Sequence, residues 1–443
     1  MADTGRVSRA VRNGMPDISF GEAAKVWTML GFTSFGGAAG QIAMMHRMLV
    51  DERKWIEEAR FLHALNFCTL LPGPEAQQLA TYIGWLMHGV RGGLFAGLMF
   101  VIPGAVLMLG LSFLYVYGHE LPLVAGLFFG IKTAVLAIVA HAIARIAKRA
   151  FKSSLPVGIA VLAFLLLMFF DAPFPAVVIG AGVAGFLKPD LFKLAPAGTS
   201  YESGGASFRD TLFAINVWCS AWMAPVALLA VTLGPDHILT SLGFFFSKLA
   251  MLSFGGAYAL LAWLAQDAVS VKGWLSAAEM ADGLGLAETT PGPTILVTQH
   301  VGFLAAWRAP APFSQPVAAA LGALITTWCT FAPSFLWIFA GAPHMESLRS
   351  NRRLAAALAA ITSVVVGVMS YLAVWFGLHL LFGESGWGAA GPLRWPTLVA
   401  STFDGKAAIL SAFAFVLVMG LHWGLVRVVL VMAVLGAAVR YLT

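Results

Sequence analysis

Two Pro-Gly-Pro strings interrupt otherwise apolar segments of the sequence, at residues 72–74 and 291–293. Proline lacks a backbone N–H and clashes with the preceding helical turn, while glycine tolerates open backbone, so neither string continues a helix. In lipid, such a break survives only where it is buried in protein or lines a wet cavity. A helix that restarts at Pro74 or Pro293 presents unpaired N–H groups and the positive end of its dipole. Two such ends, brought together near the middle of a membrane, would form an anion site.

A second pair of strings, Ser-Phe-Gly-Gly at residues 34–37 and 253–256, has similar potential. Paired glycines can expose backbone N–H groups to an oxyanion, and each serine adds a hydroxyl donor. The alternative for these glycines is close packing of membrane helices, and the alternative for the proline breaks is a simple kink. Taken as functional, the predicted oxyanion-binding residues are Ser34, Gly36, Gly37, Pro72, Gly73, Pro74, Gln77, Gln78, Ser253, Gly255, Gly256, Thr290, Pro291, Gly292, Pro293, Thr294 and Gln299.

Ionisable residues inside membrane segments are candidates for ion coupling. Glu75 and Glu288 flank the two breaks, where burial disfavours an ionised carboxylate, so either is a candidate to bind a coupling proton. Lys132 lies within an apolar segment and could balance the charge of an anion; the alternative is a buried ion pair. The sequence has no His, Cys and carboxylate cluster with metal-ligand spacing and no Gly-Lys-Ser/Thr phosphate loop. We therefore expect no metal, no cofactor and no direct use of ATP.

The composition indicates a membrane protein. Of 443 residues, 59% are hydrophobic and 11% are charged, and the mean hydropathy is +0.84. Soluble domains carry about 25% charged residues. The apolar runs are continuous rather than alternating, which favours helices over a barrel. The net charge of +6 fits basic loops that set orientation in a membrane, and no basic and aromatic surface for nucleic acid is evident.

The chain contains two related halves. Both glycine strings, both proline breaks and the pair Trp55 and Trp274 recur at one constant separation along the chain. Pro103 and Pro333 are slightly further apart, and an insertion between residues 307 and 315 accounts for the difference. We therefore predict four regions: a cytoplasmic tail over 1–16, a first repeat over 17–187, a polar linker with one unduplicated span over 188–235, and a second repeat over 236–443.

The unduplicated apolar segment at 211–233 would turn the second repeat upside down. The charge of the loops agrees with that inversion under the positive-inside rule, because two basic loops of the first half lose their charge in the second. The basic residues of these two loops are Arg47, Arg53, Lys54, Arg60, Arg145, Lys148, Arg149 and Lys152, and the corresponding loops of the second half hold only Lys272. Inverted repeats with a site near the midplane are typical of secondary transporters.

The predicted fold is an all-α integral membrane protein with two inverted-topology repeats, about nine full crossings and four broken or re-entrant motif segments. We expect the stretch 44–62, which mixes charges with apolar residues, to form an amphipathic interfacial helix. The N-terminus is predicted to be cytoplasmic and the C-terminus periplasmic. The candidate crossings are 94–117, 121–146, 155–170, 175–187, 211–233, 317–340, 354–382, 407–420 and 425–442.

At these motifs the sequence resembles the chromate ion transporter family in its long, two-domain bacterial form. The strings that carry the resemblance are Gly-Phe-Thr-Ser-Phe-Gly-Gly at 31–37, Leu-Pro-Gly-Pro-Glu at 71–75, Phe-Val-Ile-Pro-Gly at 100–104 and Ala-Glu-Thr-Thr-Pro-Gly-Pro-Thr at 287–294. They occur in both halves and cover nearly the whole chain. One departure is Ala38, where the family usually has proline, and it affects the expected geometry of the first glycine string.

The resemblance implies export of chromate from the cytoplasm across the bacterial inner membrane, driven by the membrane potential or by proton exchange, with chromate resistance as the result. Sulfate, another tetrahedral dianion, is the natural competing substrate, and whether the chain forms a homodimer is left open. A passive oxyanion channel is the alternative in another class. A membrane enzyme would need a nucleophile and a base in hydrogen-bond reach, and Ser34 with His46 or His63 is the best available set.

Overall fold

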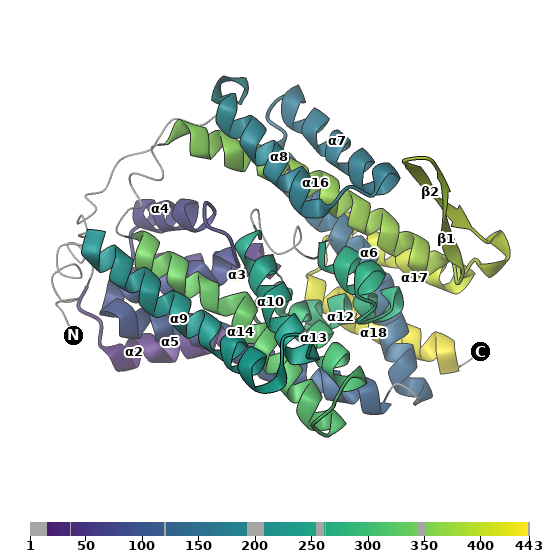
Figure 1. Cartoon of the computed structure of the whole chain (residues 1–443), viewed down its shortest axis with the longest axis horizontal. Helices are drawn as coiled ribbons and strands as arrows, with labels where there is room; N and C mark the ends of the chain where they lie inside the picture. The colour runs from purple at the N-terminus through teal and green to yellow at the C-terminus, as the bar shows by residue number, and fades with distance from the viewer. Residues whose placement is uncertain are drawn as a thin grey trace. The chain divides into compact units, whose positions relative to one another are not determined.

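The computed structural model describes residues 16–35, 37–118, 121–192, 208–253, 261, 263–342 and 351–441. This part of the chain is almost entirely helical, as predicted (Figure 1). Within it, five helices are long and apolar enough to cross a membrane: α5 (Glu75–Gly118), α6 (Pro122–Ala150), α9 (Phe208–Leu233), α14 (Gln315–Gly341) and α16 (Arg352–Leu381). The prediction of a helical membrane protein is therefore confirmed.

The described helices divide between two compact units. The first unit comprises residues 1–109, 195–257 and 290–352, and the second comprises 110–194, 258–289 and 353–443. Helix α5 contributes to both units, because the boundary falls between Leu109 and Gly110. Each unit therefore combines segments from both halves of the sequence.

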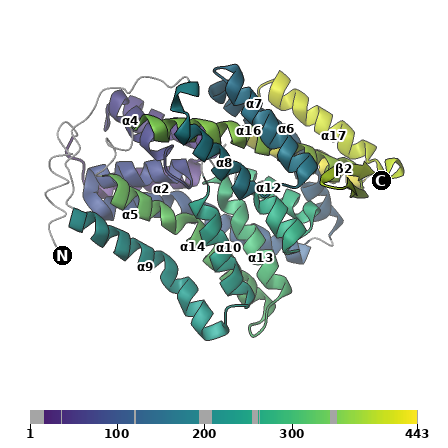
Figure 2. The ribbon, with the colours of Figure 1, turned by 45° about the horizontal axis from the view of Figure 1, so that its top comes forward.

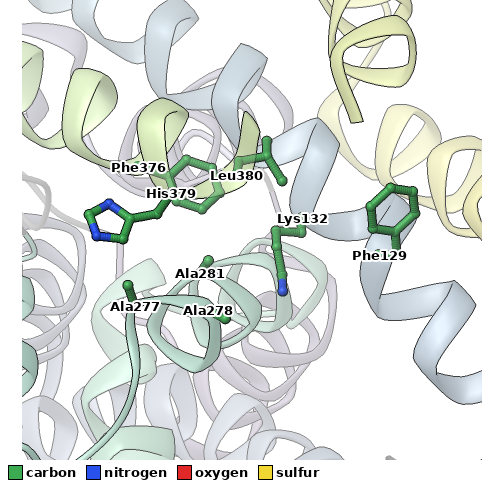
Figure 3. A pocket seen from close by; sticks show the side chains of 8 residues that line it. All are labelled: Phe129, Lys132, Ala277, Ala278, Ala281, Phe376, His379 and Leu380. Carbon is green, nitrogen blue, oxygen red and sulfur yellow. The ribbon is translucent and has the colours of Figure 1, made fainter. Parts of the chain in front are cut away.

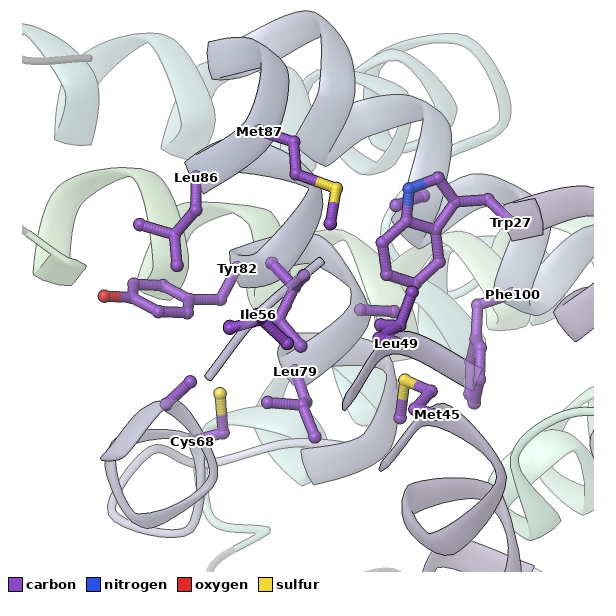
Figure 4. Packing of buried hydrophobic residues seen from close by; sticks show 14 of the residues in the cluster. Trp27, Met45, Leu49, Ile56, Cys68, Leu79, Tyr82, Leu86, Met87 and Phe100 are labelled. Atoms are coloured by element: carbon purple, nitrogen blue, oxygen red, sulfur yellow. The ribbon is translucent and has the colours of Figure 1, made fainter. Parts of the chain in front are cut away.

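The first unit contains both proline breaks. Its helices are α2 (Phe20–Thr33), α3 (Gly37–His46), α4 (Glu58–Cys68), the first part of α5, α9, α10 (Ile238–Met251), α13 (Val297–Arg308) and α14. Helices α10, α13 and α14 lie side by side (Figures 1 and 2). A buried apolar cluster joins α2, α3, α4 and α5 through side chains such as Trp27, Met45, Cys68 and Leu79 (Figure 4).

The second unit is built around α6, which packs closely against α18 (Leu425–Tyr441). Gly130 and Gly436 permit this approach, because a Cβ on either one would collide with the backbone of the other helix. The unit also contains α7 (Ser154–Phe170), α8 (Phe174–Leu187), α12 (Ala277–Thr289), α16 and α17 (Gly405–Phe415). Small residues thus set the helix contacts here, as is common where helices associate in lipid.

Several unusual backbone features occur at corresponding positions in the two halves. One-turn π-helices span Arg47–Glu52 and Gln266–Val271, each followed by a residue with positive φ, Lys54 at 53° and Gly273 at 60°. Beside each turn a basic side chain lies over a tryptophan ring at 5.1 Å, Arg53 over Trp55 and Lys272 over Trp274. All of these pairs have the same separation in the sequence as the two proline breaks.

The prediction of one amphipathic helix over 44–62 is wrong. Helix α3 ends at His46, the π-turn ends at Glu52, and the chain is non-helical until α4 begins at Glu58. The positive φ of Lys54 (53°) accounts for the interruption, because a left-handed residue cannot lie inside a right-handed helix.

A β-hairpin in the second half was not predicted. Strands β1 (Ser385–Ala390) and β2 (Leu393–Leu398) pair in antiparallel register around a turn with Gly391 at φ 61°. Arg394 anchors the hairpin, because its guanidinium donates to the Leu167 carbonyl at 3.0 Å and pairs with Asp171 at 2.7 Å. The short linker between α6 and α7 in the first half has no such hairpin.

Each predicted crossing coincides with a helical segment to within one residue over the described part of the chain, and residue 442 of the last crossing lies outside it. Some of these segments are short. Helix α8 has 14 residues, which reach about 21 Å at about 1.5 Å per residue. That is less than the hydrocarbon thickness of about 30 Å. The number of full crossings therefore stays a prediction.

Candidate functional site

Both Pro-Gly-Pro strings separate two helices, and both lie in the first unit. The first lies between the end of α4 at Cys68 and the start of α5 at Glu75. The second follows the end of α12 at Thr289 and leads through one 3-10 turn, Thr294–Leu296, into α13. Gly73 has φ 121° and Gly292 has φ 94°, a backbone conformation that glycine adopts without steric cost. The helices are therefore interrupted where the sequence predicted.

The glycine of each break is bonded to the serine of the opposite half. The Gly73 N–H donates to the Ser253 carbonyl at 3.0 Å, and the Gly292 N–H donates to the Ser34 carbonyl at 2.8 Å. The two bonds correspond to each other, because Gly73 and Gly292 have the same separation in the sequence as Ser34 and Ser253. The Ser-Phe-Gly-Gly and Pro-Gly-Pro strings thus meet in two reciprocal pairs. These glycine N–H groups already have protein acceptors, so other donors must bind any anion.

The first break is surrounded by side-chain donors. The Gln78 Nε2 donates to the Pro72 carbonyl at 2.7 Å and retains a second N–H. The hydroxyl of Ser334 has no hydrogen-bond partner among the described residues, although only 1% of the residue is exposed. A Cβ placed on Gly73 would lie 2.8 Å from Gln78 Nε2 and 3.2 Å from Ser334 Oγ. Both donors therefore converge on the same side of Gly73.

The second break has a matching polar shell. The Gln41 Nε2 donates to the Gly292 carbonyl and lies 3.5 Å from the Ser34 carbonyl. The Ser34 hydroxyl is fully buried and, among the described residues, lacks a hydrogen-bond partner. Thr290 and Thr294 are also buried. Donors of neutral side chains thus surround this break as well.

A proline-containing helix packs on each break. Gly104, next to Pro103 in α5, touches the Pro291 carbonyl so closely that no Cβ would fit. On the other side, Ser334 follows Pro333 in α14 and lies against Gly73. A hydrogen bond also joins α13 to α5, because Gln299 Nε2 donates to the Ala105 carbonyl at 2.9 Å. Similarly, Gln77 Nε2 donates to the Phe331 carbonyl of α14 at 3.5 Å.

The start of α5 offers a further group of donors. The first helical bond shown there runs from the Gln78 N–H to the Pro74 carbonyl at 3.0 Å, so the N–H groups of the preceding turn have no acceptor within the helix. They add the positive end of the helix dipole to the hydroxyl and amide donors near Gly73. The arrangement can hold a small oxyanion through neutral hydrogen-bond donors.

The predicted ion-coupling residues fall in different places. Glu75 is half-buried in the first turn of α5, and Glu288 is buried in the last turn of α12. Lys132 belongs to the second unit, where it forms an ion pair with Asp282 at 3.1 Å. The ion pair is the alternative that the sequence left open for Lys132. Gly36, Gly255 and Gly256 lie outside the described residues, while Gly37 begins α3 with φ 68°.

Sequence reasoning missed three polar residues of these regions, Gln41, Ser334 and Asp282. Each is buried within a mainly apolar segment, and that isolation was the available signal. The dyad considered for an enzyme is not formed: His46 bonds to Asp51 at 3.2 Å and to Glu58, while the Ser34 hydroxyl has no partner in the described part of the chain.

The chromate transporter family model matches the chain twice, at residues 21–186 and 240–438. A chromate transport protein of Pseudomonas aeruginosa is 29% identical over 80% of this chain and 80% of its own length. A probable chromate transport protein of Synechococcus elongatus is 24% identical over 83% and 86%. A chromate transport protein of Cupriavidus metallidurans is also 24% identical, over 80% and 82%. No solved structure matches the chain.

Proposed function

Because the chain belongs to the chromate transporter family, a family of transporters and not of enzymes, we propose that it exports chromate from the cytoplasm across the bacterial inner membrane. The names of its relatives in Pseudomonas aeruginosa and Cupriavidus metallidurans support chromate as the substrate. Export would confer chromate resistance. Sulfate has the same shape and charge and is the expected competitor for the site.

The observation that carries the site assignment is the collection of buried donors at the two breaks. The hydroxyls of Ser34 and Ser334 are nearly or fully buried and lack partners among the described residues. Burying a hydroxyl without a partner costs roughly 1–3 kcal/mol, so an anion that accepts hydrogen bonds from these two hydroxyls would recover that cost. The second N–H of Gln78 and the amide of Gln41 complete the two sets. We assign these donors, with the start of α5, to the oxyanion.

The membrane potential is sufficient to drive this export. Moving one charge through about 100 mV is worth about 2.3 kcal/mol, so a dianion leaving a negative interior gains about 4.6 kcal/mol. That corresponds to more than three factors of ten in concentration. Proton exchange would add to this force or replace it. A passive channel would let the same potential carry chromate outward, but unlike a proton exchanger it could not move the anion against its electrochemical gradient.

The proposed architecture is an inverted repeat over 17–187 and 236–443, with a cytoplasmic tail over 1–16 and the span α9 in the connecting region 188–235. The double match of the family model and the reciprocal bonds between Gly73, Ser253, Gly292 and Ser34 support two related halves. The odd span would place the N-terminus in the cytoplasm and the C-terminus in the periplasm. Assembly as a homodimer stays a prediction.

The test is uptake of radiolabelled chromate into everted membrane vesicles energised with a respiratory substrate. Everted vesicles convert cellular export into accumulation, which an uncoupler should abolish and excess sulfate should reduce. A P72A/P291A variant should accumulate no chromate. No accumulation beyond that of vesicles without the protein would refute the chromate assignment.

The site itself is tested with two serine variants. S334A removes a buried hydroxyl without a described partner, whereas S363A removes a buried hydroxyl that already bonds to the Ala359 carbonyl at 2.8 Å. We expect S334A to raise the half-saturating chromate concentration and S363A to leave it unchanged. Equal behaviour of the two variants would remove Ser334 from the site.

A further inference from the structure

A charged network lies inside the second unit, apart from the residues assigned to the breaks. The Lys132 Nζ of α6 and the Asp282 Oδ1 of α12 are 3.1 Å apart, and the Tyr115 hydroxyl of α5 donates to Asp282 Oδ2 at 3.0 Å. The Asp282 side chain is 3% exposed, whereas that of Lys132 is 19% exposed. The carboxylate is thus enclosed by its partners, and the ammonium reaches open space.

That space is a cavity of about 100 Å³. Lys132 and His379 are its polar lining, and apolar side chains such as Phe129 and Phe376 form the rest. Figure 3 shows the Lys132 side chain extending from α6 toward the helix that carries Ala277 and Ala278. A cation that lines an apolar cavity attracts anions strongly, because little water screens its charge.

The ion pair is not a requirement of the repeated fold. At the corresponding positions of the other half, His63 stands in the place of Asp282 and Thr362 in the place of Lys132. The backbone features that recur in both halves therefore form without this pair. A buried ion pair is also weak evidence for stability, since apolar residues of similar size often serve as well.

We propose that the Lys132–Asp282 pair and its cavity form a second, proton-linked oxyanion site. While Asp282 is ionised, its charge neutralises Lys132. A proton on Asp282 removes that charge and leaves the Lys132 ammonium facing the cavity, where it binds the oxyanion. Proton and anion therefore favour each other's binding at this site, and the linkage is reciprocal; it sets how pH controls occupancy of the cavity and is separate from an exchange of protons for chromate across the membrane. The proposal rests on the proposed function, because it takes chromate as the anion.

Among the described residues, other titratable groups of the elements that pack around the pair belong to α16, α18 and α12. His379 of α16 lines the same cavity, and it bonds through Nδ1 to the Trp375 carbonyl. Helix α18 packs on α12 and carries Arg427 and Arg440 near its two ends. On α12 itself, Glu279 is bonded to Ser276, and Glu288 lies in the last turn. Asp282 is the carboxylate in contact with Lys132, so it is the group we assign to the proton.

The proposal is tested by counting the protons taken up when chromate binds. Full-length protein in lipid nanodiscs is titrated with chromate by calorimetry, in two buffers of different ionisation enthalpy and in mildly alkaline solution, where free chromate is a dianion. We expect wild type to take up as much as about one proton for each chromate bound at this site. K132R should keep that uptake, since arginine stays charged.

The decisive variant is K132R/D282N, which keeps the cation and removes the carboxylate. It should bind chromate with no proton uptake. Since K132R/D282N leaves a partly exposed cation without its carboxylate, K132M/D282L serves as a second variant in which apolar residues replace the pair. That variant should take up no proton and lose the second site. H379Q alters the other polar group of the cavity, so it can change the affinity for chromate, but it should keep the proton uptake for each chromate bound.

If K132R/D282N takes up as many protons on binding chromate as K132R does, the proposal is overturned. Loss of proton uptake in H379Q would also overturn it. A wild-type protein that transports chromate but takes up no proton on binding would also overturn it, while the proposed function would stand. A wild-type protein that neither binds nor transports chromate would instead refute the proposed function, and this inference with it.

Discussion

Replacing Gly73 by alanine should impair chromate binding more than it impairs folding. Gly73 has φ 121°, and an added Cβ would lie 2.8 Å from Gln78 Nε2 and 3.2 Å from Ser334 Oγ. A residue other than glycine in such a conformation costs ~1–3 kcal/mol. The 2.8 Å contact also forces the Gln78 amide away from the Pro72 carbonyl, and losing a buried hydrogen bond costs ~1–3 kcal/mol. The two donors assigned to the anion are displaced together.

Gly234→Ala is the matched control, because Gly234 has φ 93° and a Cβ there would meet no atom within 4 Å. Gly234→Ala therefore has the cost of placing a non-glycine residue at positive φ, without any steric contact of the new Cβ. A hydrogen bond to a charged group is worth about 1.5–3 kcal/mol, so displacing Gln78 and Ser334 should raise the half-saturating chromate concentration at least about tenfold. The measurement is uptake into everted vesicles at several chromate concentrations, normalised to folded protein by size-exclusion chromatography. Equal half-saturation in the two variants would show that the donors around Gly73 do not bind the anion.

Three further predictions concern the second unit. D282N should lower the free energy of unfolding by ~1–3 kcal/mol, because the partly exposed Lys132 ammonium and the Tyr115 hydroxyl lose their carboxylate partner, whereas K132M/D282L should recover most of that loss; chemical unfolding in detergent measures both, and equal instability of the two variants would contradict the argument. Gly436→Ala should destabilise the protein by ~1–3 kcal/mol through its collision with α6, while Gly110→Ala, which meets no atom within 4 Å, should be neutral or slightly stabilising in the same assay. Arg394→Gln should release the β-hairpin from α7, so faster hydrogen exchange confined to residues 385–398 is expected, and unchanged exchange there would show that the guanidinium does not anchor the hairpin.

The helical membrane architecture could be predicted because lipid leaves few alternatives. Long apolar runs must satisfy their backbone within helices, and Pro-Gly-Pro must interrupt them, so the ends of α4 and α5 were expected near the first break. The β-hairpin at 385–398 escaped prediction because it carries glycine, proline and tryptophan in no clear alternation. Its formation depends on Arg394 reaching Asp171, and a contact so distant in sequence leaves no local pattern.

The sequence predicts the positions of the backbone breaks but not the side chains around them, because the spacing of glycine and proline says nothing of which distant residues pack there. Ser334 and Gln41 are far from Gly73 and Gly292 in the sequence, and folding brings each of them to its break. Lys132 was visible as a cation in an apolar segment, but its partner Asp282 lies in another helix. The partners of isolated polar residues therefore had to come from the structure.

The two halves share their backbone features but differ in packing, and this difference bears on how such a protein would move its substrate. Helix α4 packs in the first unit, where Phe61 and Phe67 join the core, whereas its counterpart α12 packs on α6 and α18 in the second unit. If the repeats are inverted as proposed, exchanging these two arrangements would turn a site open to one side into a site open to the other. The reciprocal serine–glycine bonds are equal in the two halves and cannot favour either state. Residues that differ between the halves can favour one state. Asp282 has His63 as its counterpart, and Glu288 has Thr69. Differences of this kind could favour one state over the other and so give the proposed export its direction, whereas backbone features that both halves share cannot.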